Sequence, residues 1–178
     1  MAVHPSRHVA NASACRLAPF DPRWAEHVVA WVRTPLEAYW LAPKTPPPLT
    51  AERLVSWRGA DQQPFMLLAP GSPGPVAYGE LNRLSGTRRE YWLGHLIVDP
   101  NQRGRGLGVQ LTRLLLAEAF DHRGARRVTL VVFPENQVAL RCYRAAGMCE
   151  DGCEWHYFPA YDRRESLVRL TATRTFWR

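Results

Sequence analysis

The chain has 178 residues, of which 46% are hydrophobic and 22% are charged, and these proportions exclude a disordered or fibrous protein. Its length predicts one domain whose core is large enough to fold without disulfides or metal. The formal net charge is +7, but the basic residues are spread along the chain, so the sequence predicts no nucleic-acid-binding arm, and no apolar run is long enough to span a membrane.

The first third of the chain is predicted to form a loose tail, one strand and a set of short helices. Residues 1–14 carry no apolar core of the kind that a secretory signal needs, so we expect a flexible tail rather than a cleaved signal. The expected elements are a strand over 15–19, a helix over 22–33 with Asp21 as its cap and Pro22 at its first position, a continuation over 34–40 after a break at Pro35, and a helix over 50–58 that follows a proline-rich loop.

The rest of the chain alternates between strand-like and helix-like patterns. The expected elements are strands over 65–69, 75–82 and 90–98, a helix over 107–123, a strand over 128–133, a helix over 137–146 capped by Asn136, and strands over 154–157 and 167–176. This order predicts a mixed α/β (α+β) fold, in which a largely antiparallel central sheet of about six to seven strands is flanked by about four helices. We expect residues 15–178 to form it as a single domain.

Four cysteines are present, at positions 15, 142, 149 and 153. Together with His156, the last three offer atoms that bind zinc, but their spacing lacks the two close pairs of common zinc sites. The sequence therefore predicts no metal site and cysteines that are free thiols. Unpaired thiols favour a reducing, cytoplasmic location.

The most informative stretch runs from Leu96 to Leu111, where an apolar strand ends and Gly104, Gly106 and Gly108 open an amphipathic helix. Glycine allows positive φ angles and a close approach of a ligand to the backbone, and the unpaired amides at a helix start favour an anion. The three glycines also fit a plain tight turn, but their alternation with arginine favours a phosphate or pyrophosphate site.

Two common nucleotide motifs do not fit this stretch. A Walker loop ends in Gly-Lys-Ser/Thr, whereas the only lysine of the chain is Lys44. The dinucleotide fingerprint G-x-G-x-x-G fails because Val109 stands at its last position when the count starts at Gly104. The pattern that remains is R-x-x-G-x-G over residues 103–108.

With a second stretch downstream, this pattern resembles the GNAT family of acetyl-CoA-dependent N-acetyltransferases. The run Val-Asp-Pro-x-x-Arg-Gly-x-Gly-x-Gly, which follows a strand, is similar to the family's pyrophosphate loop. The family pattern N-x-x-A-x-x-x-Y-x-x-x-G-F is matched by Asn136, Ala139, Tyr143 and Gly147, with Met148 in place of the usual Phe. The resemblance is strongest over 90–148, with the cofactor motif over 96–148. It implies a GNAT-like fold and an enzyme that moves an acetyl group to a primary amine.

The resemblance also implies that acetyl-CoA is the acetyl donor. The implied cofactor-binding residues are Leu96, Ile97, Val98, Arg103, Gly104, Arg105, Gly106, Leu107, Gly108, Asn136 and Tyr143. The backbone around Leu96–Val98 is expected to pair with the pantetheine arm and to hold, near a bulge, the N–H that stabilises the thioester oxygen. Tyr143 is expected to protonate the leaving thiolate. Asn136 can instead be an N-cap alone, and Tyr143 a core aromatic.

The general base is less clear from the motifs. Two positions that hold a glutamate in some members of the family hold Val131 and Trp92 here. Glu90 lies two residues before Trp92, on the same face by strand alternation, and Glu80 lies in the neighbouring predicted strand. We therefore expect Glu90 first, Glu80 second and His95 third as catalytic bases. Glu90 can also be a solvated turn residue, and a water relay can replace all three.

Aromatic residues of the first half are expected to be mostly core, with one or two of them lining the acceptor cleft: Trp24, Trp31, Tyr39, Trp40 and Trp57. The acceptor is a small molecule or a protein that the sequence does not identify. The alternative function is a non-catalytic module of the same fold that senses acetyl-CoA or binds an acidic partner. An exposed strand near the C-terminus can also pair two subunits as a homodimer.

Overall fold

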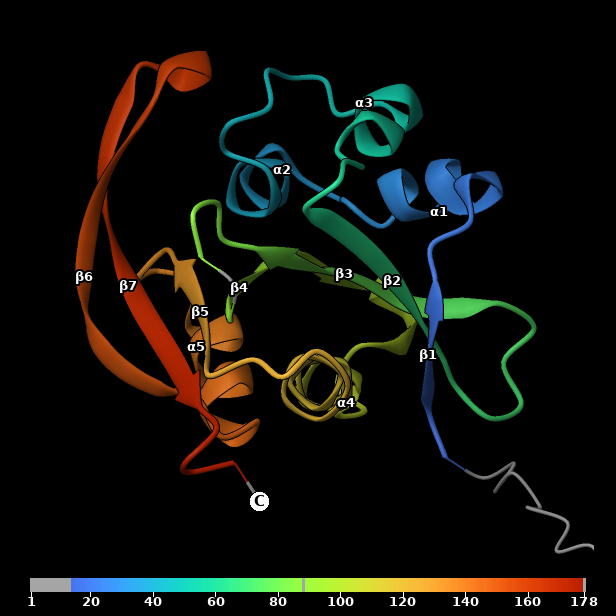
Figure 1. Cartoon of the computed structure of the whole chain (residues 1–178). Helices are drawn as coiled ribbons and strands as arrows, with labels where there is room; N and C mark the ends of the chain where they lie inside the picture. The colour runs from blue at the N-terminus through green and yellow to red at the C-terminus, as the bar shows by residue number, and fades with distance from the viewer. Residues whose placement is uncertain (1–13, 88, 178) are drawn as a thin grey trace, which may run out of the picture.

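The computed structural model describes residues 14–87 and 89–177, so the tail expected over 1–14 lies, apart from Ala14, outside the described residues. Seven strands of this part form one sheet: β1 (Arg16–Pro19), β2 (Gln62–Leu68), β3 (Pro75–Arg83), β4 (Glu90–Val98), β5 (Arg127–Val132), β6 (Cys149–Phe158) and β7 (Arg163–Thr173). Their spatial order is β1-β2-β3-β4-β5-β7-β6 (Figure 1), and the central pair β4–β5 is parallel while the other pairs are antiparallel. The expected largely antiparallel sheet is therefore confirmed.

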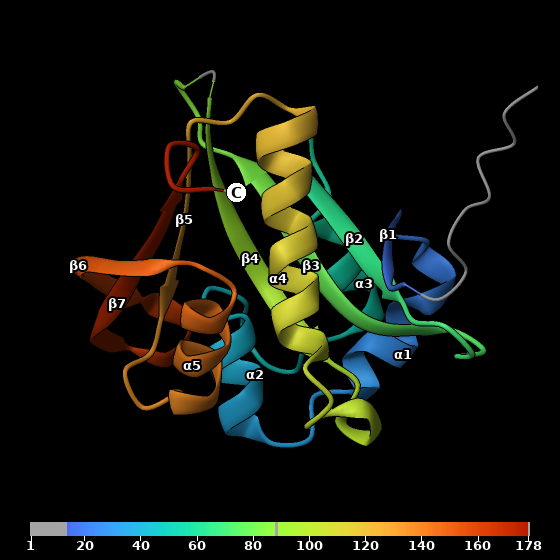
Figure 2. The ribbon, with the colours of Figure 1, turned by 90° about the horizontal axis from the view of Figure 1, so that it is seen from below.

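Five α-helices of the described residues cover the sheet on its two faces: α1 (Ala25–Ala30), α2 (Pro35–Leu41), α3 (Ala51–Ser56), α4 (Leu107–Ala117) and α5 (Gln137–Ala145). The first three lie on one face and α4 and α5 on the other (Figures 1 and 2). A π-helical turn, Glu118–His122, continues α4 towards the end that the sequence predicts. Within the described ranges, no helix is long and apolar enough to cross a membrane.

The helix starts follow from local capping. The side chains of Thr50 and Asn136 each accept a hydrogen bond from a backbone N–H of the first turn of α3 and α5, as expected of an N-cap. Asp21 does the same for a short 3-10 helix, Pro22–Trp24, which precedes α1. The break between α1 and α2 lies before Pro35 rather than at it. Thr34 caps α2, and Pro35 takes its first position, where the missing N–H of proline costs no hydrogen bond.

The last two strands are longer than the sequence predicts, because β6 starts at Cys149 and β7 at Arg163. Residues 149–153 of β6 are all exposed, so they show no alternation that would mark a strand. The hairpin of β6 and β7 curves up beside α2 (Figure 1). The ring of Tyr39 in α2 packs there against Phe158, with ring centroids 5.9 Å apart.

Two large hydrophobic cores fill the space between the sheet and the helices, and a third, smaller cluster around Tyr39 packs α2 against the β6–β7 hairpin. The larger core packs Leu111 and Leu115 of α4 onto β3. Gly79 of β3 permits this packing, because a Cβ at that position would come within 3.2 Å of both leucine side chains. The smaller core, which includes Leu54 and Tyr78, packs α1 and α3 onto the opposite face.

The two central strands, β4 and β5, pair at one end only. The paired segments are 90–92 of β4 and 127–129 of β5, and the pairing does not continue over Leu93–Val98. The backbone groups on this side of β4 are therefore left without β5 as a partner, which is the arrangement that lets an extended ligand add to a sheet. The opening lies beside the glycine-rich segment, because that segment directly follows β4.

Candidate active site

The glycine-rich loop gives its three glycines two different tasks. Gly104 and Gly106 have φ angles of 78° and 74°, which favour glycine, and a Cβ at either position would meet nothing within 4 Å. Gly106 is the N-cap of α4, so open space faces the unpaired first amides and the positive end of this helix. Gly108 has another reason to be glycine, since a Cβ there would lie 3.0 Å from the Cys142 sulfur of α5.

Arg103 connects this loop to the helices on the other face of the sheet. Its Nη1 lies 2.6 Å from Glu37 Oε1 in α2, and its Nη2 donates to the Trp31 carbonyl oxygen at 3.5 Å, just after α1. Burial alone would raise the pKa of Glu37, but the hydrogen bond of Arg103, the Arg33 backbone N–H and the charge of Arg103 together outweigh it and lower that pKa. The guanidinium of Arg103 thus ties the loop to α1 and α2, while Arg105 is exposed and contacts Gln102.

The end of β4 contains a bulge at the point where the strand leaves β5. Tyr78 pairs with Ile97 and Glu80 with Gly94, so His95 and Leu96 together lie opposite the single residue Gly79. His95 has a φ of 51°, an uncommon value for a residue other than glycine. The extra residue brings the His95 side chain to the face that carries Glu80, and this face is the one covered by α1 and α3.

A buried polar cluster surrounds the carboxylate of Glu80, which is 1% exposed. The Tyr78 hydroxyl donates to Glu80 Oε1 at 2.7 Å, and the Asn82 amide donates to Oε2 at 2.9 Å. His95 Nδ1 lies 2.9 Å from Oε2, at an angle short of a well-aligned hydrogen bond. Burial by itself would raise the pKa of Glu80, but His95, Asn82 and Tyr78 stabilise the ionised form and lower it.

A pocket of about 330 Å³ opens onto this cluster. Its lining residues are Ser56, Trp57, Arg58, Gln62, Glu80, Trp92 and His95. The His95 ring stacks on Trp57 with centroids 3.9 Å apart and lies edge-on to Trp92 at 6.2 Å. Gly94 leaves room for the Trp92 ring, because a Cβ there would overlap it. The pocket therefore combines two aromatic walls with a buried carboxylate and an imidazole.

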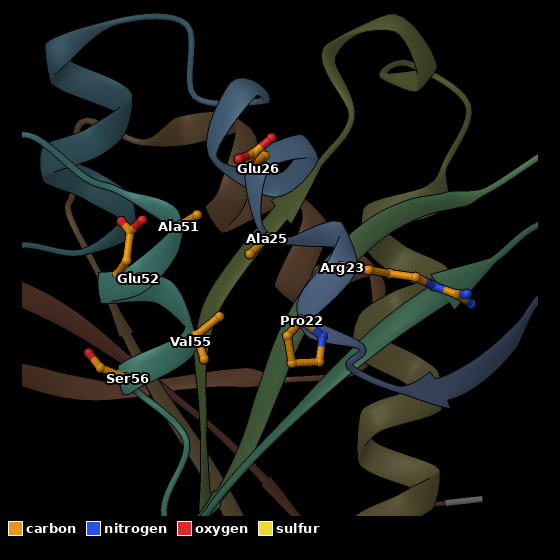
Figure 3. Close-up of a pocket in the computed structure, with 8 residues that line it drawn as sticks. All are labelled: Pro22, Arg23, Ala25, Glu26, Ala51, Glu52, Val55 and Ser56. Atoms are coloured by element: carbon orange, nitrogen blue, oxygen red, sulfur yellow. The ribbon is translucent and has the colours of Figure 1, made fainter.

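A larger hollow of about 650 Å³ lies between α1 and α3. Figure 3 shows that its charged side chains, Arg23, Glu26 and Glu52, point away from one another. Among its lining residues, no cluster of titratable groups converges on one point. We therefore place the candidate active site at the smaller pocket beside the β4 bulge.

The second motif places Asn136 and Tyr143 on α5. The Asn136 side chain accepts a hydrogen bond from the Ala139 N–H at 3.1 Å and so caps the helix. Tyr143 is half-buried and packs against the larger core. Burial, together with the neighbouring Cys142 thiol, raises the pKa of Tyr143, which keeps its hydroxyl protonated. The contact of Cys142 with Gly108 brings this part of α5 close to the start of α4.

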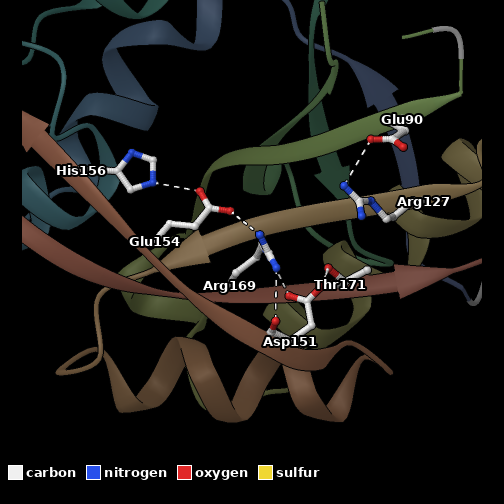
Figure 4. Close-up of polar contacts among 7 residues, drawn as sticks. All are labelled: Glu90, Arg127, Asp151, Glu154, His156, Arg169 and Thr171. Atoms are coloured by element: carbon white, nitrogen blue, oxygen red, sulfur yellow. Dashed lines mark hydrogen bonds and ion pairs between the residues drawn. The ribbon is translucent and has the colours of Figure 1, made fainter.

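The structure does not bring Glu90 together with the other predicted catalytic residues. Glu90 begins β4, and its carboxylate lies 3.3 Å from the Arg127 guanidinium in β5. At about 3.3 Å per residue, the bulge lies more than about 15 Å further along the strand. Figure 4 shows the Glu90–Arg127 pair apart from a second group of polar contacts, in which Arg169 of β7 pairs with Asp151 of β6.

Sequence reasoning named Glu80 but missed most of the groups around it. One face of β3 carries polar side chains at every second position, namely Tyr78, Glu80 and Asn82, while its other face is apolar. This period of two could have indicated that the three side chains lie together. Trp57 was expected among the aromatic residues, but nothing local indicated that it would stack on His95. No group of three or more metal-binding side chains lies together among the residues the structure describes.

The comparisons with known proteins identify the class of this chain. The model of the acetyltransferase (GNAT) family matches residues 25–148, so the chain belongs to this family. Among curated proteins, it is 36% identical over 98 residues to an uncharacterized protein of Mycobacterium leprae, covering 54% of this chain and 26% of the relative. It is 44% identical over 80 residues to a mycothiol acetyltransferase of Cellulomonas flavigena, covering 43% of this chain and 23% of that protein. The chain thus spans about a quarter of the length of these relatives.

Solved structures share the fold along almost the whole chain. A spermidine N-acetyltransferase from Vibrio cholerae, in complex with CoA and spermine, has a TM-score of 0.76 at 16% identity and covers 94% of this chain and 99% of its own. AAC(6')-Ib in complex with ribostamycin and coenzyme A has a TM-score of 0.72 at 19% identity. This match covers 91% of the present chain and 94% of the AAC(6')-Ib chain. At these identities the likeness establishes the fold.

Proposed function

We propose that this chain is an acetyl-CoA-dependent N-acetyltransferase that moves the acetyl group to a primary amine by direct attack. The observation that carries the proposal is the opening between β4 and β5, with the glycine-rich loop on one side and the Glu80–His95 pocket on the other. Family membership supports it, as do a mycothiol acetyltransferase among the relatives and spermidine and aminoglycoside acetyltransferases among the structural neighbours.

The donor site uses backbone rather than side chains. The free amides around Gly104, Gly106 and Gly108 and the start of α4 fit a pyrophosphate, and the unpaired edge of Leu96–Val98 fits the pantetheine arm. Arg105 lies on the same loop, Leu107 begins α4, and Arg103 holds the loop against α1 and α2. Acetyl-CoA supplies the activated thioester, and we propose that an N–H at the bulge stabilises the charge that develops on its oxygen.

The base that we favour is Glu80 acting through His95. An alkylamine with a pKa near about 10.4 arrives protonated and must lose a proton before it attacks. Glu80 beside His95 Nδ1 holds the proton there, which leaves Nε2 free to accept one from the amine in the pocket. Glu90 stays as the alternative base, although its carboxylate is paired with Arg127.

The proposed transfer conserves protons and electron pairs. The ammonium gives one proton to His95 Nε2, and its freed electron pair forms the C–N bond to the acetyl carbon. The C–S bond breaks, and its electron pair goes to sulfur. The second proton leaves the nitrogen and reaches the sulfur by way of the Tyr143 hydroxyl, while His95 releases the first proton to water. The raised pKa of Tyr143 suits a proton donor.

Thermal unfolding with acetyl-CoA, free CoA and NADH, followed by a thiol-release assay with a panel of amines, tests the proposal. A donor at about a hundred times its Kd stabilises the fold by about 2.7 kcal/mol, a shift of roughly 5 to 11 °C for this size. We expect shifts with acetyl-CoA and CoA but not with NADH, and release of thiol with at least one amine. Stabilisation without thiol release would favour the non-catalytic module, and no stabilisation would reject the donor site.

Two further expectations are kept as predictions. The cysteines are free, at positions 15, 142, 149 and 153, which supports a reducing compartment. A homodimer through β6 is supported by the place of this strand at the edge of the sheet, where its outer backbone groups have no partner within the sheet.

A further inference from the structure

The pocket beside the β4 bulge carries one charge at its base and one at its mouth. The Glu80 carboxylate at the base is compensated by Tyr78, Asn82 and His95. Arg58 lines the same pocket just after α3, and its side chain is exposed. Among the ion pairs of the described residues, none includes Arg58. The pocket therefore presents a guanidinium that is available to an anion.

The charge of Arg58 is felt inside the pocket. Burial and Glu80 raise the pKa of Tyr78, and Arg58 acts against them by lowering it. Arg58 is also one of the residues that line the pocket. A ligand that reaches the Glu80–His95 pair is thus also within the field of Arg58.

The walls of the pocket include two indole rings beside the polar side chains of Ser56 and Gln62. Trp57 and Trp92 flank the His95 ring, and Gly94 keeps the Trp92 ring lying along the strand. A volume of about 330 Å³ suits a molecule of the size of an amino acid. Aromatic faces would bind a planar or apolar body with offset or edge-to-face contacts.

We infer that the acceptor is a small amine with an acid group close to its amine, as in an α-amino acid: the amine faces the Glu80–His95 pair, the acid group faces Arg58, and an apolar side chain packs against the aromatic walls of the pocket. This inference rests on the proposed acetyltransferase function. A polyamine fits the same pocket poorly, because its second ammonium group would lie against the Arg58 guanidinium. The acetyl transfer itself proceeds as described above.

Matched acceptors test the inference in the thiol-release assay. L-Phenylalanine and 2-phenylethylamine differ by one carboxylate, as do L-tryptophan and tryptamine, and spermidine serves as the polyamine. We expect the wild-type kcat/KM to favour each amino acid over its decarboxylated partner by about tenfold or more, since a guanidinium–carboxylate contact is a charge-assisted hydrogen bond. The preference should disappear in Arg58→Gln. Arg16 is an exposed residue of β1, and Arg16→Gln removes the same charge. This control variant should keep the preference for the amino acids.

The outcomes separate this inference from the proposed function. Equal or faster acetylation of the decarboxylated amines or of spermidine by the wild type would overturn the inference and leave the acetyltransferase standing. A preference that survives in Arg58→Gln would overturn it in the same way. If acetyl-CoA neither stabilises the protein nor reacts with any of the five amines, the proposed function fails, and the inference fails with it.

Discussion

Glu80 carries its charge at a place where burial by itself opposes ionisation. Tyr78, Asn82 and His95 compensate for the lost water, and their combined effect lowers the pKa of the carboxyl. A glutamate held in this way can orient a histidine without competing for its proton. The positive φ of His95 is an unfavourable conformation that the surrounding structure maintains, as is often found at functional sites.

The lowered pKa of Glu80 predicts a dependence of stability on pH. The unfolded chain takes up the proton first, near the ordinary value of 4.5, so the stabilisation is complete above that pH and is lost as the pH falls through the lower pKa of the folded state. Glu80→Gln should lower the free energy of unfolding by about 1–3 kcal/mol near neutral pH. The difference in this free energy between the variant and the wild type, the stability gap, should become smaller in acid. Urea unfolding at about pH 7 and about pH 3 measures this gap.

A matched control keeps this comparison specific to the buried cluster. Glu26→Gln changes an exposed glutamate of α1. Its free energy of unfolding should differ little from that of the wild type, and this difference should hardly vary with pH. A gap for Glu80→Gln that stays constant or widens in acid would contradict the ionised, hydrogen-bonded carboxylate.

Tyr143 is proposed as the proton donor to the leaving sulfur, and its raised pKa keeps its hydroxyl protonated. Tyr143→Phe should lower kcat by about tenfold or more while the affinity for acetyl-CoA stays nearly unchanged, because only the hydroxyl is removed. Steady-state kinetics and a thermal shift with acetyl-CoA measure the two quantities. Tyr157→Phe is the matched control, since that exposed hydroxyl donates to Asp162 in the β6–β7 hairpin. Full turnover of Tyr143→Phe would remove Tyr143 as the acid.

At the level of elements, α4 is positioned by two close contacts with glycine. Gly79 lets α4 lie against β3, and Gly108 lets it lie against Cys142 of α5. These contacts fix the start of α4 next to the unpaired end of β4. Gly104 and Gly106, which have positive φ angles and open space above them, then shape the loop that faces the opening.

Substitutions at Gly106 separate loss of the donor site from loss of the fold. Gly106→Glu should abolish stabilisation by acetyl-CoA, because its carboxylate would occupy the space above the helix start. Gly106→Asn should retain much of it, because asparagine tolerates the left-handed region and is uncharged. Gly71→Glu introduces the same side chain at a φ of 71° and also meets nothing within 4 Å, so it should lower the melting temperature but keep the stabilisation. Unchanged acetyl-CoA affinity in a folded Gly106→Glu protein would contradict the assignment.

At the level of the whole molecule, the sheet consists of two parts joined by a short parallel pairing. One part is β1–β4 with α1–α3, and the other is β5, β7 and β6, whose hairpin rises beside α2 (Figure 1). Arg103 and Tyr39 add links across the molecule, the first from the loop to α2 and the second from α2 to Glu165 of β7. A donor in the opening would contact both parts at once.

Hydrogen exchange should map the donor to this opening. With acetyl-CoA bound, we expect slower exchange of the backbone amides of 96–98 and 104–108, because these groups gain hydrogen-bond partners. Segments 22–26 and 51–56, which line the larger hollow, should be unaffected and act as an internal control. Mass spectrometry with and without acetyl-CoA makes the measurement. Protection confined to the larger hollow would contradict the placement of the donor.

Much of the fold was predictable because its signals are local. Capping by Asp21, Thr50 and Asn136 depends on residues a turn apart, and the bounds of β4 were predicted as they stand. The strand at 149–153 was missed because exposed residues at an edge show no periodicity. The glycine-rich loop was recognisable because its conformation requires glycine at Gly104 and Gly106 whatever the rest of the chain does.

The order of the elements and the family were therefore readable from local chemistry. The Glu80–His95 pair was not, because its two residues come from different strands and meet only through a bulge that shifts the register by one residue. Trp57 and Arg58 reach the same pocket from the end of α3, and Glu90 is kept from it by the length of β4. Residues distant in sequence converge only when strand pairing and helix packing are complete, so the acceptor pocket is a property of the folded chain.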